Sequence, residues 1–186
     1  PFLNDAADAF GHIEDLIARE KIDCGWTRAG YFLGAWCKSH YDGMAKKVDM
    51  LNQSARSEAY VVPPERQREE IGSDYYRGGM VVGRAGHLHP ALFFKGLLEL
   101  CQKRGIAIAS RTPATRLSET GKGWAVETPR GTIQAGDVIV ATNGYTPEDV
   151  SPRHAGRIMP ALSSIIVTRP LTGDERAAQG WTSQLM

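Results

Sequence analysis

The stretch from Val138 to Thr146 joins a short β-branched run to a small, polar turn. Val138–Ala141 has the composition of a strand that is buried on both faces. After it, Thr142 offers a hydroxyl and Asn143 an amide, and Gly144 allows close approach because it has no Cβ. Ligands in open α/β sheets bind outside the carboxyl ends of strands. The sequence therefore predicts a ligand site at this turn, although a plain strand-to-loop junction would look similar.

The elements just before this turn would have to position it. Apolar residues recur at helical spacing over Pro90–Arg104, where Pro90 suits a first helical turn and Gly105 the position just past the end. An apolar run, Ile106–Ala109, follows as a candidate strand. Two short strands, Trp124–Thr128 and Thr132–Ile133, then flank a turn and lead into the strand at Val138.

The remaining elements are predicted from the same kinds of pattern. Hydrophobic spacing and chain breakers indicate helices over Asn4–Glu20, Ser39–Glu58 and Glu65–Ile71, and strands within Asp23–Trp36, Tyr75–Gly83 and Ile165–Val167. Gly78-Gly79 marks a bulge or a close approach of backbone. Thr172-Gly-Asp-Glu175 has the spacing of a capping box and predicts a short helix. The segment 151–156 is expected to be a loop.

Several short motifs follow one another along the chain. They are Gly86-His-Leu-His-Pro90, Gly105-Ile-Ala-Ile, Pro113-Ala-Thr115, Gly131-Thr-Ile-Gln-Ala135, Val138-Ile-Val-Ala-Thr-Asn-Gly-Tyr145, Arg157-Ile-Met-Pro160 and Thr168-Arg-Pro-Leu171. Taken together and in this order, they resemble the FAD-dependent oxidoreductases of the D-amino-acid oxidase (DAO) family. The motifs are closest to the glycine oxidase and γ-glutamylputrescine oxidase types, and the likeness covers residues 75–171 well.

The resemblance implies an α/β fold with α+β character. Part of a three-layer ββα FAD-binding lobe would be interleaved with a mixed-sheet substrate lobe. On this basis residues 1–22 form a helix packed on the cofactor lobe, 23–89 belong to the substrate domain, 90–150 to the FAD-binding domain, and 151–186 return to the substrate domain.

The resemblance also implies which residues approach FAD. Ala114 falls where the family reads the adenine through backbone N–H and C=O groups, so a bare side chain suffices there. The residues expected at the adenosine and pyrophosphate end are Thr142, Asn143, Gly144 and Tyr145. Among the charged residues, Arg84 is the best candidate for a position near the substrate. The alternative interpretation is that Arg84 is an ordinary surface arginine.

One family feature is missing from the sequence. Family members begin with a strand, a Gly-x-Gly-x-x-Gly turn and a helix whose amides hold the FAD pyrophosphate. Gly121-Lys-Gly123 lacks the third glycine, and Gly30-Tyr-Phe-Leu-Gly34 has the wrong spacing. We therefore expect an internal fragment whose partner is the remainder of its own polypeptide, and which alone is inactive and binds FAD weakly or not at all.

The function implied for the parent protein is oxidation of an amine or amino-acid C–N bond by hydride transfer to FAD, with O₂ as the acceptor. Because the flavin carries the chemical step, no catalytic residue is assigned within this chain. Two alternatives remain open: a dehydrogenase of the same fold that passes electrons to a carrier, and a non-catalytic binding module that keeps part of the fold.

Composition sets further bounds. The 186 residues are 42% hydrophobic and 23% charged, enough for a real core. A net charge of +1 gives no reason to expect nucleic acid, and no apolar run is long enough for a membrane span. We expect a cytoplasmic protein whose partner is a small-molecule amine or amino acid. The three widely spaced cysteines, Cys24, Cys37 and Cys101, fit reduced thiols, with Cys101 in the core.

Two other groups of residues could bind ligands. His87 and His89 lie on the same side of an extended segment, as a metal pair could, but no further ligands have suitable spacing. We expect no metal and assign them loop and helix-cap roles. The aromatic residues Trp26, Tyr31, Phe32 and Trp36 could wall a substrate pocket, although such spacing is more typical of core residues.

Overall fold

A computed structural model describes residues 2–146, 150, 157, 159 and 161–180. The chain divides into two compact units, a larger one made of residues 1–106 and 168–186 and a smaller one made of residues 107–167. None of the helices in this described part is long and apolar enough to cross a membrane. The loop predicted over 151–156 lies outside the described residues.

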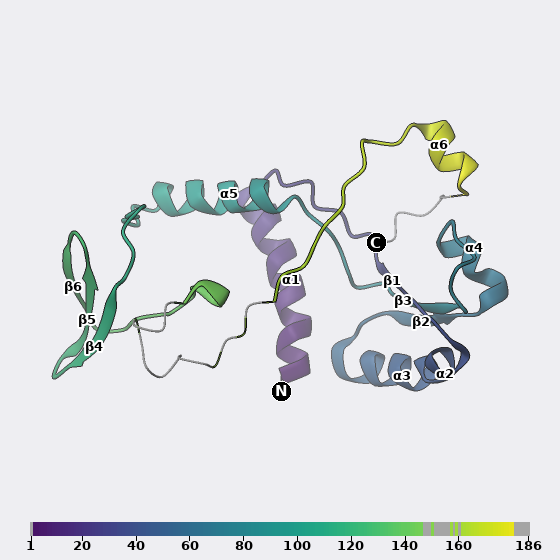
Figure 1. The fold of residues 1–186 in the computed structure, drawn as a ribbon, viewed down its shortest axis with the longest axis horizontal. Helices are drawn as coiled ribbons and strands as arrows, with labels where there is room; N and C mark the ends of the chain where they lie inside the picture. Colours follow the sequence, from purple (N-terminus) through teal and green to yellow (C-terminus); the bar gives the residue numbers. More distant parts are fainter. Residues whose placement is uncertain (1, 147–149, 151–156, 158, 160, 181–186) are drawn as a thin grey trace. The chain divides into compact units, whose positions relative to one another are not determined.

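The larger unit contains most of the helices (Figure 1). Its helices are α1 (Phe2–Glu20), α2 (Lys38–Asp42), α3 (Met44–Ala55), α4 (Gln67–Glu70), α5 (Pro90–Lys103) and α6 (Gly173–Ala178), with a 3₁₀ helix η1 (Pro64–Arg66). Its strands are β1 (Tyr31–Gly34), β2 (Ala59–Val62) and β3 (Gly79–Val82).

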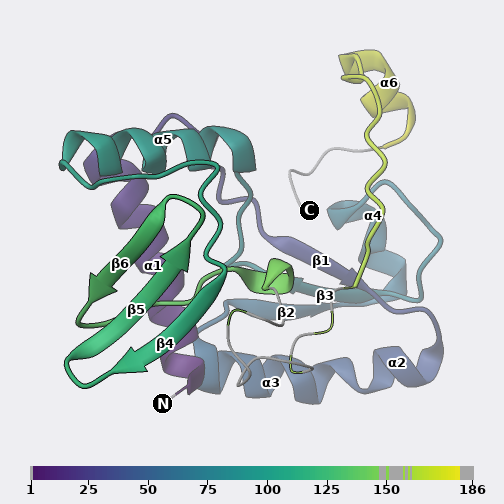
Figure 2. The ribbon, with the colours of Figure 1, turned by 60° about the vertical axis from the view of Figure 1, so that its left-hand side comes forward.

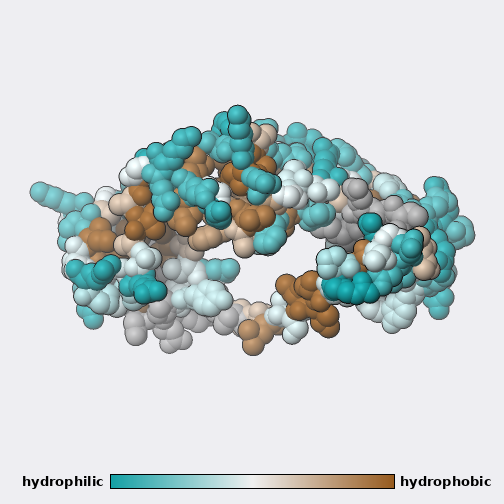
Figure 3. Space-filling model, turned by 90° about the horizontal axis from the view of Figure 1, so that it is seen from above, coloured by the Kyte–Doolittle hydropathy of each residue, from teal (hydrophilic) through white to brown (hydrophobic). Residues whose placement is uncertain are grey.

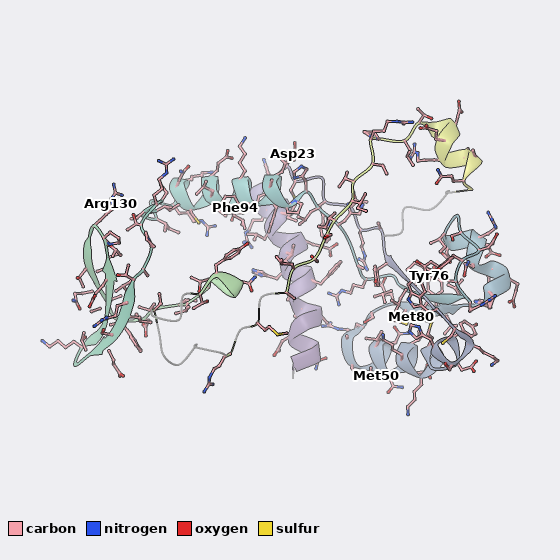
Figure 4. All side chains as sticks on the ribbon, viewed as in Figure 1. Asp23, Met50, Tyr76, Met80, Phe94 and Arg130 are labelled. Atoms are coloured by element: carbon pink, nitrogen blue, oxygen red, sulfur yellow. The ribbon has the colours of Figure 1, made fainter. Side chains whose placement is uncertain are left out.

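The strand β3 is the centre of the larger unit's sheet. It pairs antiparallel with β1 on one side and with β2 on the other. Side chains alternate between the two faces, so Met80 packs toward α3 and Val81 packs toward Phe32 on the opposite face. Figure 2 shows α3 running along the sheet. Met80 is 2% exposed, whereas Met50 on the outer side of α3 is 53% exposed (Figure 4).

A buried glutamine fixes the loop that leads into β3. The side-chain amide of Gln67 donates to the Ser73 carbonyl, and its Oε1 accepts from the Gly78 N–H at 3.1 Å. Gly78 has φ +79, and a Cβ there would lie 2.6 Å from the Val62 carbonyl oxygen. This confirms the predicted close backbone approach at Gly78-Gly79 and explains why only glycine fits.

A second core joins α1 to α5. Ile17, Ile22 and Cys24 are buried against Phe93 and Leu97 of α5. The two segments approach closely because residue 96 is a glycine, and a Cβ there would lie 2.4 Å from Cγ2 of Ile22. Another side of α5 leaves Phe94 66% exposed (Figure 4).

The ends of α5 are those predicted from the sequence. Pro90 occupies the first turn, and the N-cap His89 accepts a hydrogen bond from the Leu92 N–H at 3.4 Å. Gly105 follows the helix with φ +72, a conformation that glycine adopts without strain. The helix-cap role predicted for His89 is confirmed.

The smaller unit is built around a three-stranded meander, drawn in green in Figure 1. Its strands are β4 (Arg116–Thr120), β5 (Gly123–Thr128) and β6 (Gly131–Ala135), followed by the 3₁₀ helix η2 (Asn143–Tyr145). In register, Leu117, Val126 and Ile133 lie side by side across the sheet. The strands predicted over 124–128 and 132–133 are confirmed. Strand β4 was not predicted, because most of its residues are polar.

Three predicted strands are wrong. The described residues Ile106–Ala109, Val138–Ala141 and Ile165–Val167 form no strand. They are not covered either: Ile139 is 91% exposed and Ile166 is 93% exposed. Figure 3 shows apolar residues, in brown, open to solvent on the face that it draws. Each run has the composition of a buried strand, but among the described residues it has no neighbouring strand that could take up its backbone N–H and C=O groups.

One predicted helix needs correction. The helix predicted over Ser39–Glu58 is divided at Gly43 into α2 and α3, and it ends at Ala55. The helix stops because Arg56 and Glu58 adopt positive φ, and the residues after them form β2.

The capping box predicted at Thr172 is confirmed, since the side chain of each of Thr172 and Glu175 bonds to the backbone N–H of the other. Hydrogen bonds from Arg169 first, then Thr172, lower the pKa of Glu175 to about 2.

We predict that Gly96→Ala destabilises the larger unit. The new Cβ would overlap Ile22, and relieving such overpacking costs about 1–3 kcal/mol of the free energy of unfolding. Gly43→Ala is the matched control, because its φ is −81 and its Cβ would be 3.6 Å from the nearest atom. Urea denaturation followed by circular dichroism measures both changes. Equal stabilities for the two variants would contradict the packing of α1 on α5.

Candidate functional site

The predicted ligand turn is a hydrogen-bonded, solvent-facing structure in the smaller unit. The Thr142 carbonyl accepts from the Tyr145 N–H at 3.1 Å, and the Asn143 carbonyl accepts from the Thr146 hydroxyl at 2.8 Å. The hydroxyls of Thr142 and Thr146 lie 2.6 Å apart and bond to each other. Tyr145 is 91% exposed. The turn is therefore fixed internally while its outer groups stay open to a ligand.

Asn143 gives the turn its shape. Its φ is +50, in the left-handed region that asparagine tolerates better than most residues. Within the described part of the chain, the side-chain amide of Asn143 has no hydrogen-bond partner. It is thus a free donor and acceptor at the exposed end of the turn. The sequence suggested the polar group but not the left-handed backbone.

Ala114 has a backbone N–H and C=O that are free to bond to a ligand, as its expected role requires. The residue is half-buried, and among the described residues its N–H and C=O make no hydrogen bond. Both neighbouring segments are fixed. Thr115 donates from its N–H and its hydroxyl to the Glu127 carbonyl at 2.8 and 3.1 Å, and Arg130 donates to the Thr112 hydroxyl at 3.4 Å (Arg130 is labelled in Figure 4). A backbone N–H and C=O that have no partner and lie between fixed segments can form hydrogen bonds with the edge of a heterocycle.

A hydrogen bond ties the chain beyond the turn to the strand beyond Ala114. The Leu117 N–H donates to the carbonyl of Val150 at 3.0 Å, and Val150 is buried. Leu117 lies three residues after Ala114, and Val150 lies five residues after Tyr145. The segment that follows Ala114 and the segment that follows the ligand turn are therefore joined by a hydrogen bond at the edge of β4. Ala114, Thr142, Asn143, Gly144 and Tyr145 all belong to this unit.

Arg84 belongs to the larger unit. It follows β3, and its ζ carbon lies 5.3 Å from the centroid of the Phe10 ring on α1. A guanidinium over an aromatic face is a cation–π arrangement. Phe10 falls within the helix predicted over Asn4–Glu20, but nothing in the sequence marked it as a neighbour of Arg84. The substrate role of Arg84 stays a prediction.

The histidines and cysteines take mostly structural positions. His87 exchanges backbone hydrogen bonds with Thr27 at 2.9 Å in both directions. The three cysteines are free: Cys24 is buried and Cys37 is exposed, while Cys101, which was predicted in the core, is only half-buried. A hydrogen bond with the Ser39 hydroxyl is the main cause that lowers the pKa of the Cys37 thiol. Among the described residues, no three His, Cys, Asp or Glu side chains gather where they could hold a metal.

The predicted aromatic group divides between core and surface. Phe32 is buried beneath the sheet, and Trp26 packs on Phe10 with ring centroids 5.7 Å apart. Trp36 is mostly exposed and lies edge to face with Tyr75, with ring centroids 5.5 Å apart. The core reading is therefore correct for Phe32 and Trp26. It is not correct for Trp36 or for Tyr31, which is 43% exposed.

Comparison with known proteins gives one family. The sequence pattern of the family described as FAD-dependent oxidoreductase (DAO) matches residues 3–185. A protein named probable oxidoreductase OrdL from Haemophilus influenzae is 31% identical over 169 residues, which cover 86% of this chain. The γ-glutamylputrescine oxidoreductase of Escherichia coli is 26% identical over 162 residues, or 87% of this chain. In both cases the chain spans about 38% of the relative's length.

The fold has relatives among solved structures. The crystal structure of glycine oxidase from Geobacillus kaustophilus superposes with a TM-score of 0.67 at 17% sequence identity. The match covers 81% of this chain and 41% of the oxidase. This likeness confirms the predicted fold class.

We predict that the left-handed backbone at Asn143 makes the ligand turn sensitive to β-branching there. Asn143→Val should cost about 1–2 kcal/mol of local stability, because a β-branched residue disfavours φ +50. Asn143→Gly is the matched control and should keep the turn. Hydrogen exchange of the Tyr145 and Thr146 amides reports the difference, with about tenfold faster exchange in the valine variant. Equal protection in both variants would mean that the turn does not have this backbone.

Proposed function

Because this chain belongs to the FAD-dependent oxidoreductase (DAO) family, we propose that it forms part of an enzyme that oxidises the C–N bond of an amine or amino acid with FAD. The observation that carries this proposal is the match of the family's pattern to residues 3–185, nearly the whole chain. The two named oxidoreductases among its relatives support the same class of reaction.

The smaller unit supplies the groups proposed to hold the cofactor. The N–H and C=O of Ala114 have no partner in the described chain and would bond to the edge of the adenine. Thr142 to Tyr145 would line the adenosine and pyrophosphate end, where the Asn143 amide is free to donate. These positions fit FAD in chemistry, since the main chain of Ala114 and the side-chain amide of Asn143 offer donors and acceptors that the described residues do not use.

The chemical step belongs to the cofactor. When bound, FAD would supply the acceptor for a hydride from the carbon next to the amine nitrogen, the amine would be oxidised to an imine, and O₂ would take the two electrons from the reduced flavin. The chain's own residues bind and orient. No residue of this chain is proposed as an acid or base.

The rest of a longer polypeptide is the partner that we propose for the exposed apolar runs. Ile106–Ala109 and Val138–Ala141 are strand-like in composition but unpaired in the structure. Strands supplied by that polypeptide would satisfy their backbone groups and bury their side chains. The same polypeptide would bring the glycine-rich turn that holds the pyrophosphate. We therefore expect the 186-residue chain alone to bind FAD weakly or not at all.

Two other functions remain as alternatives. A dehydrogenase of the same fold would pass the electrons to a carrier instead of O₂. A binding module would keep this part of the fold without flavin chemistry, and the missing Gly-x-Gly-x-x-Gly stretch is the observation that favours it.

The visible spectrum of the flavin tests the proposed reaction. We expect the longest polypeptide that contains this chain, purified with FAD, to be yellow and to bleach when a substrate amine or amino acid is added without air. A panel of amines and amino acids identifies the substrate class. The 186-residue chain, treated in the same way, serves as the control and should stay colourless.

The recovery of colour separates the alternatives. Recolouring on admission of air indicates an oxidase, and a bleached protein that stays colourless in air indicates a dehydrogenase. A long polypeptide that takes up no FAD would refute the flavin chemistry and leave the binding module as the better reading.

We predict that only the backbone of Ala114 matters for FAD affinity. Ala114→Pro removes the N–H and should weaken binding by at least about tenfold, the equivalent of one lost hydrogen bond of about 1.4 kcal/mol. Ala114→Ser keeps the main-chain donor and acceptor and should change the affinity by less than about twofold. FAD fluorescence quenching on the long polypeptide measures both. An unchanged affinity in the proline variant would remove Ala114 from the adenine site.

A further inference from the structure

A groove lies between the end of α1 and one side of α5, within the larger unit. Its volume is about 420 Å³, and small-molecule sites have volumes of roughly 300–1,000 Å³. Residues 20–23 form one wall, and two rows of side chains on α5 form the other. Residues four apart share one face of a helix. The two rows on α5 are Leu92, Gly96 and Leu100 and, beside them, Lys95, Glu99 and Lys103.

The floor of the groove is apolar and closely packed at its centre. Ile22 is 8% exposed and lies against Gly96, where a Cβ would be 2.4 Å from Cγ2 of Ile22. Leu92 is 42% exposed and Leu100 is half-buried, so both leave apolar surface open on either side of the glycine. A ligand with an apolar chain would cover this surface and release the water on it.

Hydrogen bonds fix both ends of the groove. At one end, Nη2 of Arg104 donates to Oε1 of Glu20 at 2.7 Å, which ties the end of α5 to the end of α1. At the other end, the His89 N–H donates to the Cys24 carbonyl at 2.8 Å, and Figure 4 shows Asp23 near the start of α5. The walls are therefore held in place without a ligand. Binding to such a preformed site loses little conformational entropy.

Two of the three carboxylates that line the groove already have cationic partners. Glu20 accepts hydrogen bonds from Arg104 at 2.7 Å and from Arg19 at 3.2 Å. The carboxylate of Glu99 lies 3.7 Å from the Lys95 ammonium group. Because each carboxylate has a cation beside it, neither repels an anionic ligand as strongly as an unpaired carboxylate would.

Two lysines at the Arg104 end of the groove have no acidic partner among the described residues. Lys21 follows Glu20 and Lys103 precedes Arg104, so the Glu20–Arg104 ion pair brings both lysines to this end. The C-termini of α1 and α5 also lie here, and each adds about half a negative charge, which leaves about one positive charge for a ligand. Asp23, which is also unpaired in the described chain, lies toward the other end and disfavours an anion there.

We propose that this groove binds a medium-chain carboxylate, an anionic head group on an unbranched apolar chain. The carboxylate bonds to the ammonium groups of Lys21 and Lys103, and the chain lies along the row from Leu100 to Leu92. That row is about 12 Å long at 1.5 Å per residue, which suits a chain of about eight carbons. Asp23 sets the direction of the ligand because it repels the head group. This site goes beyond the proposed flavin chemistry and does not depend on it.

Isothermal titration calorimetry with sodium octanoate tests the site in the longest polypeptide that contains this chain. We expect saturable binding of octanoate. Two comparison ligands divide octanoate into its parts, since acetate has the head group without the chain and 1-octanol has the chain without the charge. Each should bind at least about tenfold more weakly than octanoate, because it makes only part of the contacts.

Variants locate the binding in the groove. Lys21→Asn combined with Lys103→Gln removes both free charges and should weaken octanoate binding at least about tenfold. Asparagine is used at position 21 because Lys21 has φ +54, a conformation that asparagine tolerates. Leu92→Gln should weaken octanoate binding about fivefold and leave acetate binding unchanged. Lys47→Gln is the matched control, since Lys47 is an exposed lysine on α3 that does not line the groove.

Several outcomes would overturn the proposal. They are no octanoate binding, an unchanged affinity in the double lysine variant, an equal loss in Lys47→Gln, or binding of acetate or 1-octanol as tight as that of octanoate. If the double variant does not fold, Lys103→Gln alone decides. Binding weakened by about threefold or more supports the site, and unchanged affinity overturns it.

Discussion

Backbone N–H and C=O groups of an extended segment need partners, and a neighbouring strand is the usual source. In the larger unit, β3 has such neighbours on both sides, and its residues are among the most deeply buried of the chain. Runs of similar composition elsewhere have no neighbouring strand in the part of the chain that the structure describes. Ile139 and Ile166 therefore remain exposed although their sequence resembles that of β3. Pairing, more than hydrophobicity, decides which β-branched runs of this chain become strands.

This constraint also separates what the sequence can predict from what it cannot. Local signals were sufficient where a local contact forms the structure: Pro90, His89 and Gly105 bound α5, and Thr172 caps α6. They failed at Val138–Ala141, where the outcome depends on a partner strand. They also failed at Gly43, because the helical spacing of apolar residues continues through the break between α2 and α3.

For the candidate site, the sequence could predict residue types but not conformations. Thr142 and Asn143 were recognised as polar groups after a β-branched run, whereas the mutual bond of Thr142 and Thr146 and the left-handed Asn143 require coordinates. Ala114 carries no signal in its side chain, and its expected role came from family resemblance alone. Arg84 could be singled out by its place after β3, but its platform on Phe10 joins residues far apart in sequence.

The order of strands in the larger sheet has a consequence for how the chain folds. The partners β2 and β3 are separated by a short stretch of sequence, while β1 pairs with β3 across the whole of α2, α3 and β2. Closing the longer loop costs more chain entropy, so β1 should join last. The β2–β3 pair with α3 would then form the folding nucleus, and side chains such as Phe32 on β1 would govern chiefly the rate of unfolding.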